Sequence, residues 1–347
     1  MRRTIRSLVS HLAALGLLCG AADLGAEGFN RSGTAAAPEL FIPVGARDMA
    51  LGGASIATTA GLEALHWNPA GLARAQSDVG LLFSTMSYIA DIQVNYTAIS
   101  GRFGRFGSLA LSLKSLDIGA IPITTEAQPD GTGGTYSPTF FVLGTTYARR
   151  LNERAVLGLT GNYISNSFDR VGATGLSFSA GLQYANLGGV DGLDLGVALK
   201  HIGSRLRYGG EGLLRRGQLD DLRRSSAFYE VSSSSADLPS TFEIGLGYRY
   251  PLAEAGRLNL TSLFQHHSFD HDQYKLGAEY LHGDFFALRS GFDYASDAED
   301  DTFLFGTSFG FGLQFDLGSL EDVRLDYAYT SVDHFDGLNT FTFQLGF

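Results

Sequence analysis

Over most of the chain, apolar residues alternate with polar or very small residues, and this alternation begins near Asp78. Between Leu193 and Lys200, for example, every odd position is apolar and every even position is charged or small. Successive side chains of a β-strand point to opposite faces, so a two-residue period gives each strand one apolar and one polar face. The chain is therefore predicted to fold as a series of half-polar strands.

The alternating segments number fourteen, and their connections differ in length in a regular way. The segments lie near residues 78–89, 91–103, 106–117, 138–150, 154–166, 173–185, 191–202, 239–251, 257–267, 273–282, 284–295, 302–316, 321–331 and 337–347. Long connections at 118–137, 203–238 and 296–301 alternate with short ones at 103–106, 150–154, 251–257 and 282–284. The short connection near Asp91 departs from this pattern. Because outer-membrane barrels keep their periplasmic turns short, we predict an all-β fold, a transmembrane antiparallel β-barrel of about 14 strands over residues 78–347.

The bulky face of these strands is expected to meet lipid, because the opposite face is too small to pack a core. In the segment 302–316, Phe309 and Phe311 alternate with Gly310 and Gly312. Small residues suit a wet or plugged lumen. The inner faces also carry charges of both signs, namely Lys114, Lys200, Glu243, Arg249, Lys275, Glu279, Arg289, Asp293, Arg324 and Asp326. We expect these charges to form a salt-bridge network rather than a selectivity filter.

The last strand has apolar residues at every odd position from Phe341 to the terminal Phe347. This ending resembles the C-terminal assembly signal of outer-membrane barrels. Open sheet edges are aggregation hazards, and a barrel removes them by pairing its last strand with its first. The ending therefore agrees with a closed barrel in the outer membrane.

The first 22 residues have the three-part layout of a secretory signal peptide. Arginines at positions 2, 3 and 6 precede an apolar stretch from about Leu8 to Gly20, and small residues follow at Ala21 and Ala22. Cleavage after residue 22 would remove three arginines and no acidic residue, so the formal net charge would change from −11 to −14. The single cysteine, Cys19, lies inside this segment, so we expect no disulfide and no thiol site in the mature chain. The acidic balance also disfavours nucleic-acid binding.

Residues 23–77 lack the strand alternation and form a separate segment. It contains GARDMALGGA at 45–54 and HWNPAGLA at 66–73, and we expect short helical turns and loops there. The residues singled out in these two motifs are Gly45, Ala46, Arg47, Gly52, Gly53, Trp67, Asn68, Pro69 and Ala70. Their expected roles are structural, with Trp67 as an anchoring aromatic rather than a ligand contact.

These two motifs resemble those of the PorV/PorQ family, which belongs to the wider FadL-like group of outer-membrane barrels. The resemblance implies that residues 23–77 fold back into the lumen as a plug, or hatch. An 8-strand barrel is filled by its own side chains, and barrels of about 16 to 18 strands leave an open channel. A barrel of about 14 strands lies between these sizes, so its lumen has space for a plug. The specific motifs occupy only about residues 45–73.

The sequence offers only poor candidates for metal-binding or catalytic sites. His266, His267, Asp270, His271 and Asp272 are potential metal ligands, and Asp297, Glu299, Asp300 and Asp301 are acidic, but both stretches fit solvated loops better than metal sites. No catalytic triad context, phosphate-binding Gly-Lys-Ser/Thr loop or zinc-binding His-Glu-x-x-His motif is present. We therefore expect neither an enzyme nor a cofactor.

Two functions remain open for such a barrel. The closer resemblance implies an accessory or docking component of type IX protein secretion or surface delivery, whose partners would be secretion machinery or secreted proteins. The alternative, from the wider FadL-like group, is passive transport of hydrophobic small molecules. The long connection 203–238 could bind either a partner protein or a hydrophobic ligand, because it carries apolar residues among arginines and serines. These apolar residues are Leu213, Leu214, Leu219, Leu222, Phe228 and Tyr229.

Overall fold

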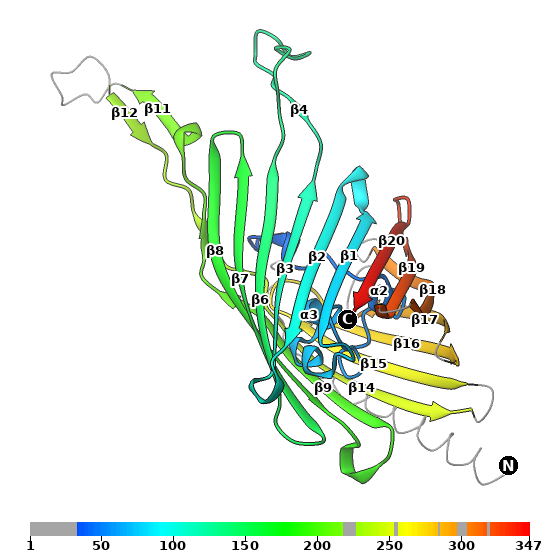
Figure 1. Ribbon diagram of the computed structural model, residues 1–347. Helices are drawn as coiled ribbons and strands as arrows, with labels where there is room; N and C mark the ends of the chain where they lie inside the picture. The colour runs from blue at the N-terminus through cyan, green and yellow to red at the C-terminus, as the bar shows by residue number, and fades with distance from the viewer. Residues whose placement is uncertain (1–32, 218–226, 253–255, 284, 297–303, 318–319) are drawn as a thin grey trace. The chain divides into compact units, whose positions relative to one another are not determined.

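The computed structural model describes residues 33–217, 227–252, 256–283, 285–296, 304–317 and 320–347. The expected signal peptide at 1–22 and the start of the segment 23–77 lie outside these residues. The main feature is a closed antiparallel barrel, in which each strand pairs with its neighbours in chain order and β1 pairs with β20 (Figure 1). In that last pairing, Gly80 lies opposite Gly346 and Ser87 lies opposite Asn339.

The fourteen barrel strands agree with the predicted segments to within a few residues, so the predicted fold class is confirmed. Their bounds are β1 (Val79–Ser87), β2 (Gln93–Arg102), β3 (Ser108–Asp117), β6 (Thr139–Arg150), β7 (Ala155–Phe168), β8 (Val171–Tyr184), β9 (Leu193–Gly203), β14 (Thr241–Pro251), β15 (Arg257–His267), β16 (Gln273–His282), β17 (Phe286–Ala295), β18 (Phe305–Leu317), β19 (Leu320–Val332) and β20 (Leu338–Gly346).

The two faces of the barrel strands differ as the alternation predicts. On β18 and β19, Phe309, Phe311 and Leu325 are exposed on the outer surface, while Ser308 and Asp326 are buried. The outer surface therefore presents bulky apolar side chains, as a lipid-facing surface should. No helix in the described part of the chain is long and apolar enough to cross a membrane.

The long connections 118–137 and 203–238 lie at the same end of the barrel, and their described residues form short two-stranded ribbons that the sequence did not predict. The ribbons pair β4 (Ile121–Pro122) with β5 (Thr135–Tyr136), β10 (Leu206–Arg207) with β13 (Ser235–Ala236), and β11 (Leu214–Gly217) with β12 (Ala227–Glu230). In Figure 1 the β11–β12 ribbon extends well beyond the barrel strands. Since periplasmic turns of outer-membrane barrels are short, we call this end the external end and the opposite end the periplasmic end.

Residues 33–77 form a compact plug inside the barrel. Its helices are η1 (Pro38–Leu40), α2 (Ala46–Met49), α3 (Ala64–Trp67) and η2 (Pro69–Arg74), and further 3₁₀ turns lie in the barrel connections at η3 (Ile89–Asp91), η4 (Gly104–Phe106), η5 (Leu187–Gly189) and η6 (Glu211–Leu213). At the external end, the Ala36 amide donates to the Asp237 carbonyl over 2.9 Å. At the periplasmic end, the Arg102 guanidinium donates to the carbonyls of Ala75, Gln76 and Ser77. The plug therefore runs the length of the lumen.

Glycines on the inner wall allow the plug backbone to approach closely. A Cβ added to Gly158 would lie 2.2 Å from the Pro69 carbonyl carbon, and one added to Gly291 would lie 2.1 Å from the Gly52 amide nitrogen. Gly181, Gly196 and Gly277 have comparable contacts with plug atoms. These five inner-face glycines are thus explained by direct contact with the plug, at a distance that no other residue type permits.

We predict that Gly158→Val displaces the plug, because the added side chain has no space beside Pro69. Overpacking of this kind costs about 1–3 kcal/mol. The matched control is Gly161→Val on the same strand, where an added Cβ would meet only the Phe178 ring at an ordinary 3.6 Å. Limited proteolysis of the refolded protein should cleave the segment 33–77 faster in Gly158→Val than in the control. Equal cleavage in the two variants would contradict the close seating of the plug.

Candidate functional site

The first plug motif, GARDMALGGA at residues 45–54, binds the plug to the barrel wall on several sides. The Ala46 amide donates to Thr342 Oγ1 over 2.8 Å, and the Arg47 guanidinium donates to both carboxylate oxygens of Glu279 at 3.2 Å. Gly45 and Gly52 have φ values of 87° and 64°, in the left-handed region that glycine adopts without strain. The motif therefore combines tight backbone turns with anchoring contacts.

The second plug motif, HWNPAGLA at residues 66–73, holds the plug segments to one another and to β8. The Trp67 indole N–H donates to the Val44 carbonyl over 2.9 Å, and its ring lies so close to Gly53 that an added Cβ would be 2.6 Å away. The Asn68 side chain donates to the carbonyls of Ile56 and Leu182 at 2.8 and 3.2 Å. Its Oδ1 also accepts from the Ala70 amide, which caps η2 where Pro69 begins the turn.

The inner-face charges singled out in the sequence all lie on the lumen side, and the structure joins them in pairs. The ion pairs are Lys200–Glu243 at 2.8 Å, Lys275–Asp293 at 2.9 Å, Arg289–Glu279 at 2.8 Å, Arg289–Asp326 at 2.5 Å, Arg249–Asp194 at 3.2 Å and Arg324–Asp322 at 2.6 Å. Lys114 instead donates to the carbonyls of Glu39 and Ile42. The arrangement is a network of opposite charges, and two of its acids, Asp194 and Asp322, were not among the predicted residues.

Plug residues complete this network. Arg47 joins the Glu279–Arg289–Asp326 chain, and Arg74 lies 3.7 Å from Asp194. Burial raises the pKa of the nearby Glu63 carboxyl to about 8, and Asp48 acts in the same direction. Arg47 and Arg289 oppose this rise, so the Glu63 carboxyl is electrostatically linked to the same network.

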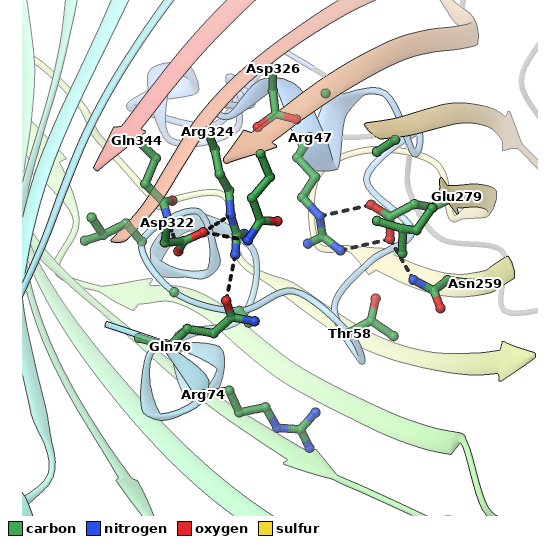
Figure 2. Close-up of a pocket in the computed structure, with 18 of the residues that line it drawn as sticks. Arg47, Thr58, Arg74, Gln76, Asn259, Glu279, Asp322, Arg324, Asp326 and Gln344 are labelled. Carbon is green, nitrogen blue, oxygen red and sulfur yellow. Dashed lines mark hydrogen bonds and ion pairs between the residues drawn. The ribbon is translucent and has the colours of Figure 1, made fainter. Parts of the chain in front are cut away.

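A polar cavity of about 330 Å³ lies on the periplasmic side of the plug. Figure 2 shows Arg47 directed at Glu279, and Arg324 placed between Asp322 and Gln76. Every charged residue labelled in that view has an opposite charge within ion-pair distance, and for Arg74 this is Asp194 at 3.7 Å. The cavity therefore suits water and ions better than an apolar ligand.

A second cavity, of about 200 Å³, lies on the external side of the plug. Its apolar lining includes Phe41, Trp67 and Leu263, and the Phe41 ring packs edge-on against His267 at 5.0 Å. Several buried polar atoms that belong to its lining have no hydrogen-bond partner in the described part of the chain, namely Glu243 Oε2, Asp293 Oδ1, His201 Nδ1 and both ring nitrogens of His267. The cavity is thus amphiphilic, and no described residue lines both cavities.

The histidine-rich stretch is divided between two surfaces. His266 is exposed on β15 and lies 2.7 Å from Asp272, whereas His267 is buried toward the lumen. No group of three potential metal ligands is assembled within the described ranges. The acidic stretch 297–301 lies outside those ranges.

The long connection 203–238 exposes apolar residues away from the barrel wall. Leu214, Phe228 and Tyr229 are all exposed on the β11–β12 ribbon, with Phe228 at 73%. Leu213 is half-buried beside them, while Leu219 and Leu222 lie outside the described residues. The alternation of the sequence gave no signal for this ribbon, because both of its faces are exposed.

Comparisons with known proteins agree with this architecture. The chain is similar to the CymD monoaromatic hydrocarbon channel, with a TM-score of 0.52 and 14% identity over 88% of this chain and 96% of that chain. It is also similar to the Pseudomonas putida toluene transporter TodX, with a TM-score of 0.51 and 12% identity over 87% of this chain and 97% of that chain. At such identities the likeness shows the fold alone. No curated protein matches the chain.

The family comparison is more specific. The model of the family described as type IX secretion system protein PorV matches residues 26–215, which is more than half of the chain and includes both plug motifs. The resemblance seen in the motifs is therefore confirmed, and so is the expected location in the outer membrane. The chain is an outer-membrane β-barrel that belongs to the PorV family.

Proposed function

We propose that this protein is an accessory docking component of type IX secretion or a related surface-delivery pathway. The membership of the PorV family is the observation that carries the proposal. Two features of the structure support it. A plug that runs the length of the lumen leaves little room for a protein to pass through this barrel itself, and the external end offers exposed ribbons to which a partner can bind.

The β11–β12 ribbon is the best candidate docking surface. Phe228 lies opposite Arg216, and Tyr229 lies opposite Arg215, so each aromatic residue of β12 faces an arginine of β11. Aromatic residues and arginine are the residues most enriched where protein interfaces gain their binding energy. An isolated two-stranded ribbon is also marginally stable in water, and its free edges can pair with a strand of a partner.

The base of this ribbon is fixed to the barrel, so the ribbon is presented in a defined position. Gly172 on β8 forms a β-bridge with Gly209, and the Ser233 hydroxyl donates to the Tyr208 carbonyl. The β10–β13 pair adds a second tie close by. A partner that binds the ribbon is therefore held at the external end, beside the barrel mouth.

We expect Phe228→Ser combined with Tyr229→Ser to reduce partner capture by roughly tenfold or more, the effect of losing a central aromatic anchor. The measurement is the yield of cross-linked secretion partner in outer membranes, together with the amount of type IX cargo at the cell surface. Ile123→Ser, which changes an exposed apolar residue directly after β4, is the control. If the double variant captures partner and delivers cargo as well as the control does, with equal barrel levels, the docking surface lies elsewhere.

A second function is favoured by the external cavity. Its apolar wall and unpartnered polar atoms suit a small hydrophobic or amphiphilic molecule. The CymD monoaromatic hydrocarbon channel and the toluene transporter TodX share the fold. Passive transport of such a molecule would use this cavity as its first binding site.

The single tryptophan of the chain, Trp67, lines this cavity and so reports on its occupancy. If the cavity binds monoaromatic compounds, titration with toluene should change the Trp67 emission in a saturable way. Phe41→Ala, which removes part of the lining, should weaken that binding, whereas Phe309→Ala on the outer surface should not. A linear response that is the same in both variants would count against a ligand site and leave docking as the better account.

A further inference from the structure

A basic hollow of about 440 Å³ lies at the periplasmic end of β2, β3 and β6. Four arginines line it, namely Arg102, Arg105, Arg149 and Arg150, together with Ala73, Gly104, Gly107, Ser108 and Ala148. No acidic residue lines the hollow, and Glu153 in the adjacent turn is outside it. The concentration is notable because the whole chain has 25 basic and 36 acidic residues.

Three of these arginines have no partner within the described part of the chain. Arg102 is engaged, because it donates to plug carbonyls and lies 3.4 Å from Asp78. Arg105, Arg149 and Arg150 are exposed and make no ion pair or side-chain hydrogen bond to described residues. Like charges held together repel one another, so this hollow is favoured when an anion occupies it.

The hollow is also held in shape by the turn between β2 and β3. The Tyr147 hydroxyl donates to the Phe106 carbonyl over 2.6 Å, and the two rings pack at 5.2 Å. Gly107, with φ of 119°, lies so close to β6 that an added Cβ would be 2.5 Å from the Ala148 carbonyl oxygen. The turn that carries Arg105 is therefore packed directly against the end of β6 that carries Arg149 and Arg150.

The surroundings of the hollow place it at the edge of the lipid. Phe103, Phe106 and Leu151, in the turns that border it, are all exposed. Aromatic residues of outer-membrane barrels form girdles at the level of the lipid headgroups. A basic site beside exposed apolar side chains at this level matches a molecule with an anionic head and hydrocarbon chains.

We propose that this hollow binds the phosphate of an anionic phospholipid headgroup in the periplasmic leaflet. The planar guanidinium groups of Arg105, Arg149 and Arg150 can each form paired hydrogen bonds with phosphate oxygens. The acyl chains would then lie along Phe103 and Phe106. An acidic peptide from a periplasmic partner would neutralise the arginines. It would not bury the exposed apolar side chains of Phe103, Phe106 and Leu151.

The test uses the full-length protein refolded in an uncharged detergent. Short-chain phosphatidylglycerol is titrated, and the midpoint of thermal unfolding is followed on heat-modifiable gels. We expect a saturable rise in the midpoint for the wild type. Arg149→Gln combined with Arg150→Gln should need about thirtyfold more lipid for the same rise, since each basic residue near an anionic surface contributes roughly a factor of five. The control pair, Arg207→Gln with Arg215→Gln at the external end, should respond like the wild type.

Two further titrations identify the source of the phosphate. Phosphatidylcholine of the same chain length and inorganic phosphate should each give little of the rise that phosphatidylglycerol gives. A full rise with inorganic phosphate alone would overturn the lipid assignment, and so would equal responses of the double variant and the control pair. If the double variant fails to fold, the single substitution Arg105→Gln in the exposed turn serves the same test, with an intermediate loss expected.

Discussion

In the membrane, every backbone hydrogen bond of this protein must be made between its own groups. Lipid offers no partner for an N–H or C=O group, so strands can cross only as a closed barrel. The pairing of β1 with β20 closes this one. The fourteen strands of the closed barrel enclose a lumen that is too wide for the wall side chains to fill alone.

The plug fills the space that the wall side chains leave empty, and residues of the wall make room for it and bind it. Glycines such as Gly158 and Gly291 let the plug backbone reach the strands, while Thr342 and Glu279 supply polar partners for the first motif. Because the charges inside are paired with one another, few ions are left uncompensated in a region of low dielectric constant. Removing one partner would leave the other buried and unpaired, which is why plug and wall stabilise each other.

The sequence predicted the barrel well, because lipid on one side and plug on the other impose a strict two-residue period on every strand. It also predicted the inner-face charges, whose positions follow from the same period. It did not predict which charges pair, because Arg74 and Asp194 are far apart in the chain and meet only once the plug is seated. The β11–β12 ribbon was missed because it is exposed on both faces and therefore shows no alternation. The two cavities were not predicted, because their linings combine side chains from many strands and the plug. The sequence alone does not show which of these side chains lie next to one another.

We expect the plug to close this barrel to ions rather than to leave an open pore. Ion conductance in a planar lipid bilayer tests it most directly, with the full-length protein compared with a form that lacks residues 33–77. We predict that the full-length protein is nearly silent and that the shortened form, once its folding is confirmed, conducts steadily, because a lumen of this strand number admits ions when its obstruction is removed. Large, steady conductance from the full-length protein would contradict the account.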